Sequence, residues 1–239
     1  MPDETLPRER AAELSYRYGQ LSGAALLRPL IEREFRGRIA LVSSFGTEAA
    51  MLLHLVAAID PSVPVLFVDT GKLFGETLRY RDELIARLGL ADVRTLQAAP
   101  ARIDATDPDG VLWFRDANAC CRLRKVEPLV AGLSGFDAWI SGRKRYQGGL
   151  RTAVPVIEEF EGRIKINPIA DWSQDEVDAA FAATGLPPHP LLADGFLSVG
   201  CMPCTSRVAS DTVDRRAGRW AGSEKTECGI HLSLDSSGL

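Results

Sequence analysis

Short apolar segments alternate with segments of helical periodicity along most of the chain. Residues 39–43 and 63–68 are continuous apolar runs, which is typical of strands buried on both faces, and residues 47–59 and 76–88 have the pattern of helices. Shorter runs predict further strands at 93–96, 138–141 and 164–167. This alternation predicts an α/β fold, with a mostly parallel sheet and helices on both faces.

Later segments carry different signals. A helix is predicted over residues 175–184, because Ser173 and Glu176 have the spacing of a capping box and Gly185 supplies a stop. From Thr205 onward, apolar periodicity is weak and charged residues and glycines are frequent. We therefore expect the C-terminal tail, residues 205–239, to be mobile.

Composition and charge limit the classes of partner. The 239-residue chain is 46% hydrophobic and 25% charged, which excludes disordered, collagen-like and coiled-coil classes. Its net charge of −4 argues against nucleic acid and against anionic membrane surfaces. The longest apolar stretch, 49–59, is too short for a membrane helix, and no secretory signal pattern is found at the N-terminus. A cytoplasmic location is expected.

The five cysteines do not have the pattern of a disulfide framework. They comprise an adjacent pair, a C-x-x-C pair and a single residue: Cys120, Cys121, Cys201, Cys204 and Cys228. The first four, flanked by Arg and Lys, offer thiolates to either zinc or an iron-sulfur cluster. An adjacent pair is awkward for one tetrahedral ion but can reach two irons, so the spacing favours a 4Fe-4S cluster.

The remaining cysteine, Cys228, stands alone on the polar tail. Lys225 and His231 would favour its thiolate form, and Glu227 would oppose it. It is interpreted as a nucleophile or redox thiol, with an incidental surface cysteine as the alternative.

Polar turns follow the first two predicted strands. Ser43, Ser44 and Gly46 lie between a strand and a helix, where parallel sheets bind anions, although an ordinary capped turn has the same pattern. Asp69 and Thr70 end the second strand at the same edge of the sheet, and Asp69 can equally cap the next helix. These turns predict a ligand crevice.

Basic residues gather in two places in this acidic chain. Arg143 and Arg145 follow the strand at 138–141, and Arg216 and Arg219 lie in the tail. Such runs are usually solvated, but guanidinium groups also bind phosphate and sulfate oxygens in pairs.

Taken together, these segments resemble the iron-sulfur type of assimilatory adenylyl-sulfate (APS) reductases, in the phosphoadenylyl-sulfate (PAPS) reductase family. The matching stretches follow one another in order along the chain: 43–48, 68–74, 120–129, 139–145, 166–172, 200–205, 219–222 and 225–231. Two departures are Gly75, where the family often has Pro, and the run 196–199. Neither removes a cysteine.

The resemblance implies an adenine nucleotide alpha-hydrolase-like, Rossmann-like fold in three parts. These are an N-terminal helical segment (1–35), a nucleotide-binding domain with the iron-sulfur site (36–204) and the flexible tail with its catalytic cysteine (205–239). The implied cofactor is a 4Fe-4S cluster, held by Cys120, Cys121, Cys201 and Cys204.

The resemblance also implies the reaction. Cys228 would attack the sulfur of APS, expel AMP and become an S-sulfo-cysteine, and thioredoxin would then release sulfite, as in sulfate assimilation and cysteine biosynthesis. The implied substrate-binding residues are Ser43, Ser44, Gly46, Asp69, Thr70, Lys125, Arg143, Arg145, Arg216 and Arg219.

Three alternatives stay open at the level of sequence. The enzyme can accept PAPS as well as APS, it can be a relative that adenylylates a substrate without needing Cys228, or it can be a zinc-stabilised nucleotide-binding module. A homo-oligomer is also left open.

Overall fold

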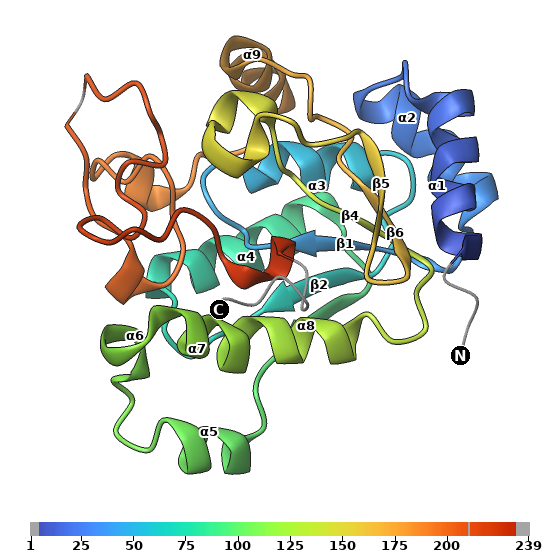
Figure 1. Ribbon diagram of the computed structural model, residues 1–239. Helices are drawn as coiled ribbons and strands as arrows, with labels where there is room; N and C mark the ends of the chain where they lie inside the picture. The colour runs from blue at the N-terminus through green and yellow to red at the C-terminus, as the bar shows by residue number, and fades with distance from the viewer. Residues whose placement is uncertain (1–4, 210, 233–239) are drawn as a thin grey trace.

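The protein is built around a single six-stranded sheet (Figure 1). The computed structural model describes residues 5–209 and 211–232, so the expectations for residues 1–4, 210 and 233–239 lie outside the described residues. The strands are β1 (Ile39–Ser43), β2 (Val65–Val68), β3 (Val93–Leu96), β4 (Ala138–Ile140), β5 (Ile157–Phe160) and β6 (Arg163–Ile166).

The strand order is β3-β2-β1-β4-β6-β5, and every pair is parallel except β5 with β6. The predicted, mostly parallel sheet is confirmed, and all five predicted strands are present. Strand β5 was not predicted, because Ile157-Glu-Glu-Phe lies at the sheet edge, is only partly buried and lacks a continuous apolar run.

Helices cover both faces of the sheet (Figure 1). They are α1 (Thr5–Tyr18), α2 (Gly23–Pro29), α3 (Ala49–Ala57), α4 (Gly75–Leu88), α5 (Pro100–Thr106), α6 (Leu112–Arg115), α7 (Ala117–Cys121), α8 (Glu127–Gly132) and α9 (Gln174–Thr184). The capping box predicted for α9 is formed, since Ser173 and Glu176 bond each other's backbone N–H groups.

Alternate residues of the central strands face two separate cores. Leu41, Phe67 and Ile140 pack in a large cluster with residues of α1, α2, α3 and α4. Leu66 and Trp139 point to the opposite face and pack against α8. Burial on both faces explains why these strands read as continuous apolar runs.

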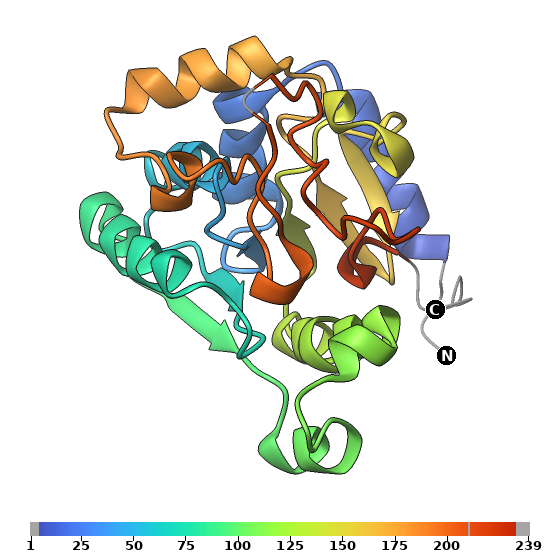
Figure 2. The same ribbon diagram turned by 90° about the vertical axis from the view of Figure 1, so that its left-hand side faces the viewer.

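The chain after Cys201 crosses in front of the carboxyl edge of the sheet (Figure 2). It is tied there by isolated bridges between Leu73 and Cys201 and between Thr205 and Arg219. Near its end, the ring of His231 stacks on Trp139 at 5.9 Å between ring centres. This segment therefore closes over the edge at which the polar turns were predicted to meet.

Within the part of the chain that the structure describes, no helix is long and apolar enough to cross a membrane.

Lys165 of β6 is fully buried beside two aromatic rings. Its Nζ lies 3.9 Å from the ring centre of Phe160, 4.7 Å from that of Trp139 and 3.7 Å from Oε1 of Glu158. Burial first, and then the charge of Arg143, lower the pKa of Lys165, and Glu158 opposes them, so that the pKa comes to about 7.

We expect Lys165 to make the free energy of unfolding rise with pH above about 7. The unfolded chain keeps the proton up to the ordinary lysine value and the folded chain does not, so the unfolded state binds more protons across this window. The contribution is at most about 1.4 kcal/mol per pH unit. Urea unfolding at about pH 7 and about pH 9.5 should show a rise that Lys165→Met removes. The same pH dependence in both proteins would contradict this assignment.

Candidate active site

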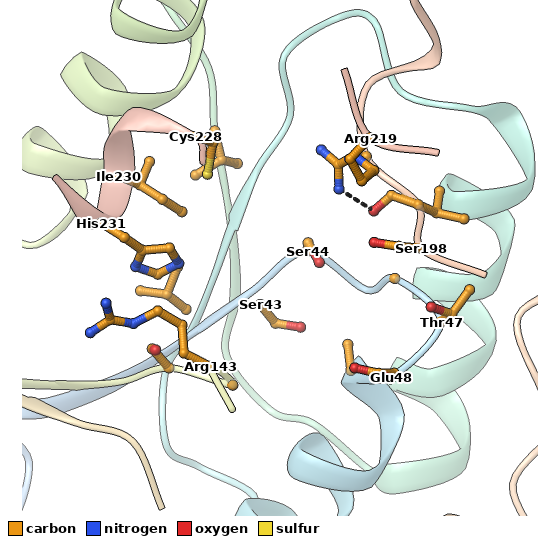
Figure 3. A pocket seen from close by; sticks show the side chains of 18 of the residues that line it. Ser43, Ser44, Thr47, Glu48, Arg143, Ser198, Arg219, Cys228, Ile230 and His231 are labelled. Carbon is orange, nitrogen blue, oxygen red and sulfur yellow. Dashed lines mark hydrogen bonds between the residues drawn. The ribbon is translucent and has the colours of Figure 1, made fainter. Parts of the chain in front are cut away.

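A cavity of about 210 Å³ opens at the carboxyl edge of the sheet, under the C-terminal segment (Figure 3). Its floor comes from the ends of β1, β2 and β4, and its walls come from residues 198–201 and from the tail. The structure thus brings together two sequence regions that were predicted separately.

The turn after β1 forms one wall through Ser43, Ser44, Gly46 and Thr47. The Phe45 N–H donates to Oγ of Ser43 at 3.2 Å, and Oγ1 of Thr47 donates to the carbonyl of Leu197 at 2.9 Å. These bonds fix the turn beneath the segment that leads to Cys201. The predicted crevice residues Ser43, Ser44, Gly46 and Thr70 all line the cavity.

Glu48, at the end of the same turn, is paired with a lysine and hydrogen-bonded by two further side chains. Its carboxylate lies 2.6 Å from Nζ of Lys144 and accepts hydrogen bonds from Tyr146 at 2.9 Å and Gln147 at 3.0 Å. Burial raises the pKa of Glu48, but Lys144 and the hydrogen bonds outweigh it and lower the pKa overall. Lys144 is accordingly held by a carboxylate at the cavity wall.

The cavity is basic although the chain is acidic. Six cations and two carboxylates line it: Lys125, Arg143, Lys144, Arg151, Arg216 and Arg219, with Glu48 and Glu227. A local excess of positive charge of this kind attracts an anionic ligand without a basic protein surface.

Several polar atoms at the cavity lack partners. Nε of Arg143, Nε of Arg219 and Nδ1 of His231 are buried without a hydrogen bond. No carboxylate among the described residues lies within ion-pair distance of Lys125 or Arg219. Since buried donors are normally satisfied, these groups have the character of a ligand site.

Gly200 leaves the room that Arg219 occupies. A Cβ at position 200 would overlap the guanidinium of Arg219, whose Nη1 donates to the carbonyl of Val199 at 3.3 Å. The guanidinium therefore lies flat against the backbone of the cavity wall.

The four paired cysteines come from two segments of the chain, and one of them, Cys201, lines the cavity. Cys120 and Cys121 end α7 and are buried, while Cys201 and Cys204 flank a short turn, and all four are free thiols. The hydroxyl of Thr70 lies 3.2 Å from Sγ of Cys201. Burial, and then the charges that Cys121 and Cys201 would carry, raise the pKa of Cys120 to about 12.

Across residues 5–209 and 211–232, no group of three or more His, Cys, Asp or Glu side chains is placed to hold a metal ion. The donor set itself consists of soft sulfur ligands only, and its two pairs are close enough to interact electrostatically across the site.

Lys125 lines the cavity close to the cysteines. Burial disfavours its charge, but the sulfurs of Cys201, Cys228 and Cys121 outweigh that effect and raise the pKa of Lys125. This lysine is a fixed positive charge that both the sulfur groups and a cavity ligand can share.

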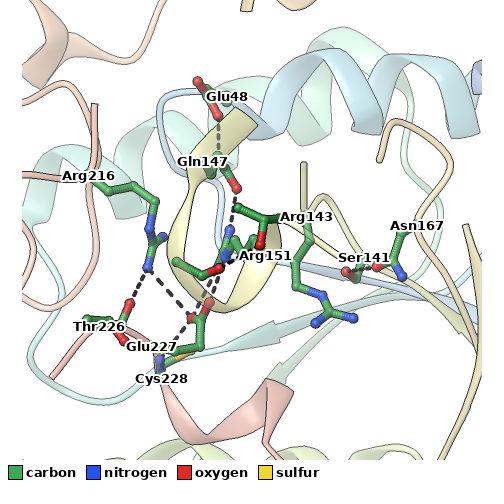
Figure 4. Close-up of polar contacts among 12 residues, drawn as sticks. Glu48, Ser141, Arg143, Gln147, Arg151, Asn167, Arg216, Thr226, Glu227 and Cys228 are labelled. Carbon is green, nitrogen blue, oxygen red and sulfur yellow. Dashed lines mark hydrogen bonds and ion pairs between the residues drawn. The ribbon is translucent and has the colours of Figure 1, made fainter. Parts of the chain in front are cut away.

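Cys228 lines the cavity and is half-buried. Its N–H donates to Oε1 of Glu227 at 2.9 Å, and Glu227 is paired with Arg151 (Figure 4). Lys225 donates from Nζ to Oδ1 of Asn118, which anchors the tail to α7. The thiol is thereby held at the mouth of the basic cavity.

His231 lies beside Arg143 at the cavity (Figure 3). Burial first, and then nearby cations including Lys165 and Arg143, lower the pKa of His231 well below its usual value, so the imidazole is neutral.

Two expected substrate-binding residues lie outside the cavity lining. Asp69 accepts hydrogen bonds from Gly71 N–H and Gln97 Nε2, both at 2.9 Å, as a turn-capping carboxylate would. Arg145 donates to the carbonyl of Val154 at 2.9 Å and is paired with Asp171. By contrast, Lys125, Arg143, Arg216 and Arg219 all line the cavity.

Sequence reasoning missed Arg151 and underrated Glu227 as parts of this site. Arg151 lies beyond the basic run at 143–145, and only its contact with the tail brings it to the cavity. For Glu48, the sequence offered one signal, which was its place in the predicted turn motif at 43–48.

Known proteins resemble this chain over most of its length. The model of the phosphoadenosine phosphosulfate reductase domain matches residues 38–207. The adenosine 5'-phosphosulfate reductase of Mesorhizobium japonicum is 46% identical over 94% of this chain and 88% of its own length. The enzyme of the same name from Chelativorans sp. is 47% identical over 93% and 91%.

Solved structures show the same fold. The phosphoadenylyl-sulfate reductase of Candida auris, in complex with phosphate, superposes with a TM-score of 0.69 at 24% identity, covering 84% of this chain and 97% of that one. FMN adenylyltransferase of Candida glabrata gives a TM-score of 0.54 at 14% identity over 92% and 84%. With a domain model over most of its length and relatives matched nearly end to end, the chain belongs to the phosphoadenosine phosphosulfate reductase family.

Proposed function

We propose that this enzyme reduces adenylyl sulfate (APS) to sulfite and AMP. The observation that carries the proposal is that Cys228 lines the same cavity as the turn after β1 and the cations Lys125, Arg216 and Arg219. A soft nucleophile thus borders the cavity in which an adenylylated anion would bind. The curated relatives, named for APS, support this choice of substrate.

The chemical step needs a thiolate positioned at the sulfur of APS and positive charge around the leaving phosphate. The Cys228 thiolate attacks the sulfur of APS, an S–S bond forms, and the S–O bond to the phosphate breaks with its electron pair. AMP leaves with that oxygen, and Cys228 carries an S-sulfo group. Because the leaving phosphate gains negative charge, fixed cations around it lower the barrier.

The unpartnered groups of the cavity match the phosphosulfate. Nε of Arg143 and Nε of Arg219 are buried donors without acceptors, and sulfate and phosphate oxygens would satisfy them. The neutral ring of His231 offers a further polar contact without adding charge. Ser43, Ser44 and Gly46 would receive the nucleotide at the turn after β1, where backbone N–H groups bind anions, and Thr70 would contribute from the turn after β2.

The four paired cysteines are proposed to hold a 4Fe-4S cluster. A donor set made only of thiols suits it, and the adjacent pair Cys120 and Cys121 is awkward for one tetrahedral ion but can reach two irons of a cluster. When bound, the cluster would add an electrostatic influence at the cavity. Lys125, which faces both the cysteines and the cavity, would position the substrate's anionic end.

A second thiol must complete the cycle. Thioredoxin is proposed as its source: its thiolate attacks Sγ of Cys228, sulfite leaves, and the carrier's other cysteine resolves the mixed disulfide. This cycle would serve assimilatory sulfate reduction and cysteine biosynthesis in a reducing, cytoplasmic setting.

Replacing the proposed nucleophile should abolish turnover without affecting the binding of the cofactor. Cys228→Ser should keep the iron content and brown colour but lower anaerobic sulfite release from APS by roughly 10³-fold or more. Competing turnover of APS and PAPS by the wild type defines the substrate. Normal turnover by the variant, or an SO3 adduct mapped by mass spectrometry to another cysteine, would end the assignment.

Replacing a proposed cluster ligand should have the opposite signature. We expect Cys204→Ser to lose iron, acid-labile sulfide and visible absorbance, because a cluster needs its thiolates deprotonated and complete. Metal analysis of anaerobically purified protein measures this directly. One zinc with no iron or sulfide in the wild type would favour a zinc-stabilised module instead.

The arginines inside and outside the cavity should behave differently. Arg219→Ala removes a charge-assisted contact to the substrate and should raise the KM for APS roughly 10- to 100-fold. Arg145→Ala, whose guanidinium is engaged by Asp171 and Val154, should change KM by less than about twofold. Equal effects of the two substitutions on steady-state kinetics would contradict the cavity as the binding site.

A further inference from the structure

The carboxylate next to the nucleophile is held by the scaffold. The side chain of Glu227 is only 5% exposed, and that of Arg151 is 10% exposed. Arg151 donates from Nε to Oε2 of Glu227 at 2.6 Å and from Nη2 to Oε1 at 2.9 Å, a fork of two parallel bonds (Figure 4). A bidentate pair of this kind adds geometric specificity to the attraction between the charges.

The same carboxylate controls the backbone of the nucleophile. Oε1 of Glu227 accepts the N–H of Cys228 at 2.9 Å, and Arg216 lies 3.7 Å from that oxygen. Arg216 also donates to the carbonyl of Thr226 at 3.0 Å. The two residues before Cys228 are therefore fixed by guanidinium groups, one from the scaffold and one from the tail.

The contacts continue from Arg151 to the opposite wall of the cavity. Nη1 of Arg151 donates to Oε1 of Gln147, and Nε2 of Gln147 donates to Glu48 at 3.0 Å. Glu48 ends the turn after β1 that is proposed to receive the nucleotide. A continuous row of hydrogen bonds thus runs from that turn to the peptide of Cys228 (Figure 4).

We propose that Glu227 is a positioning residue, whose ion pair with Arg151 holds Cys228 at the cavity for attack on sulfur and must open before the cysteine reaches an external thiol. The proposal rests on the function proposed above. Arg151 and Arg216 also line the cavity, so the carboxylate and the substrate's anionic groups share the same cations. The half-buried position of Cys228 gives a reductant limited access while the pair is closed.

The test separates the two halves of the cycle in the full-length protein. Glu227→Gln keeps the shape and an oxygen acceptor for the Cys228 N–H but removes the charge that Arg151 binds. Single-turnover adduct formation with APS should slow roughly 10- to 100-fold. Reduction of the preformed S-sulfo adduct by an added dithiol should be unchanged or faster.

A second readout does not depend on APS. Alkylation of Cys228 by iodoacetamide, followed by peptide mass spectrometry, should be severalfold faster in Glu227→Gln, because the tail opens more often. Arg151→Lys, which keeps the charge but not the fork, should show the same direction, and the double variant should be no faster than the faster single variant. If APS turnover proved absent, the alkylation rates would still test the ion pair.

Asp171→Asn is the matched control, since it removes the carboxylate from another arginine pair outside the cavity. Its alkylation rate and both half-reactions should stay within about twofold of wild type. The proposal is overturned if Glu227→Gln alkylates and forms adduct at wild-type rates. It is also overturned if both half-reactions slow equally, because that pattern indicates general damage to the site.

Discussion

Buried positive charge is the constraint on which this site depends. Six cations line one cavity in a chain of net charge −4, and ionised groups taken from water must be matched by partners. The structure matches Lys144 with Glu48 and Arg151 with Glu227, and it places Lys125 beside sulfur groups. Only part of the charge is therefore left for a ligand, and that part lines the same cavity as Cys228.

The sheet makes this concentration possible. Parallel strands bring the ends of β1, β2 and β4 to one edge, and their apolar residues are divided between two cores on opposite faces. The polar turns that follow these strands therefore meet at the edge of the sheet. The tail completes the enclosure, anchored at one end by Cys201 and at the other by the stacking of His231 on Trp139.

The central strands were predictable because strands that are buried on both faces have continuous apolar runs in the sequence. The edge strand β5 was not, because Ile157-Glu-Glu-Phe is only partly buried and has neither a continuous apolar run nor a regular alternation. Among site residues, spacing identified the cysteines but could not separate Arg143, which lines the cavity, from Arg145 two positions on. The two arginines differ in their partners, since Arg143 pairs with Glu158 and Arg145 pairs with Asp171. Both partners are distant in sequence, so spacing alone does not reveal the difference. Arg151 was not predicted for the same reason, since its contact with Glu227 joins residues that are 76 positions apart in the sequence.

Gly200 shows how a position can shape recognition through what it lacks. The guanidinium of Arg219 rests on bare backbone there, in space that any side chain would claim. A methyl group at this point would have to displace the guanidinium from the wall, although Arg219 itself would be unchanged. The absence of a side chain at one position thus decides where the donors of another residue lie.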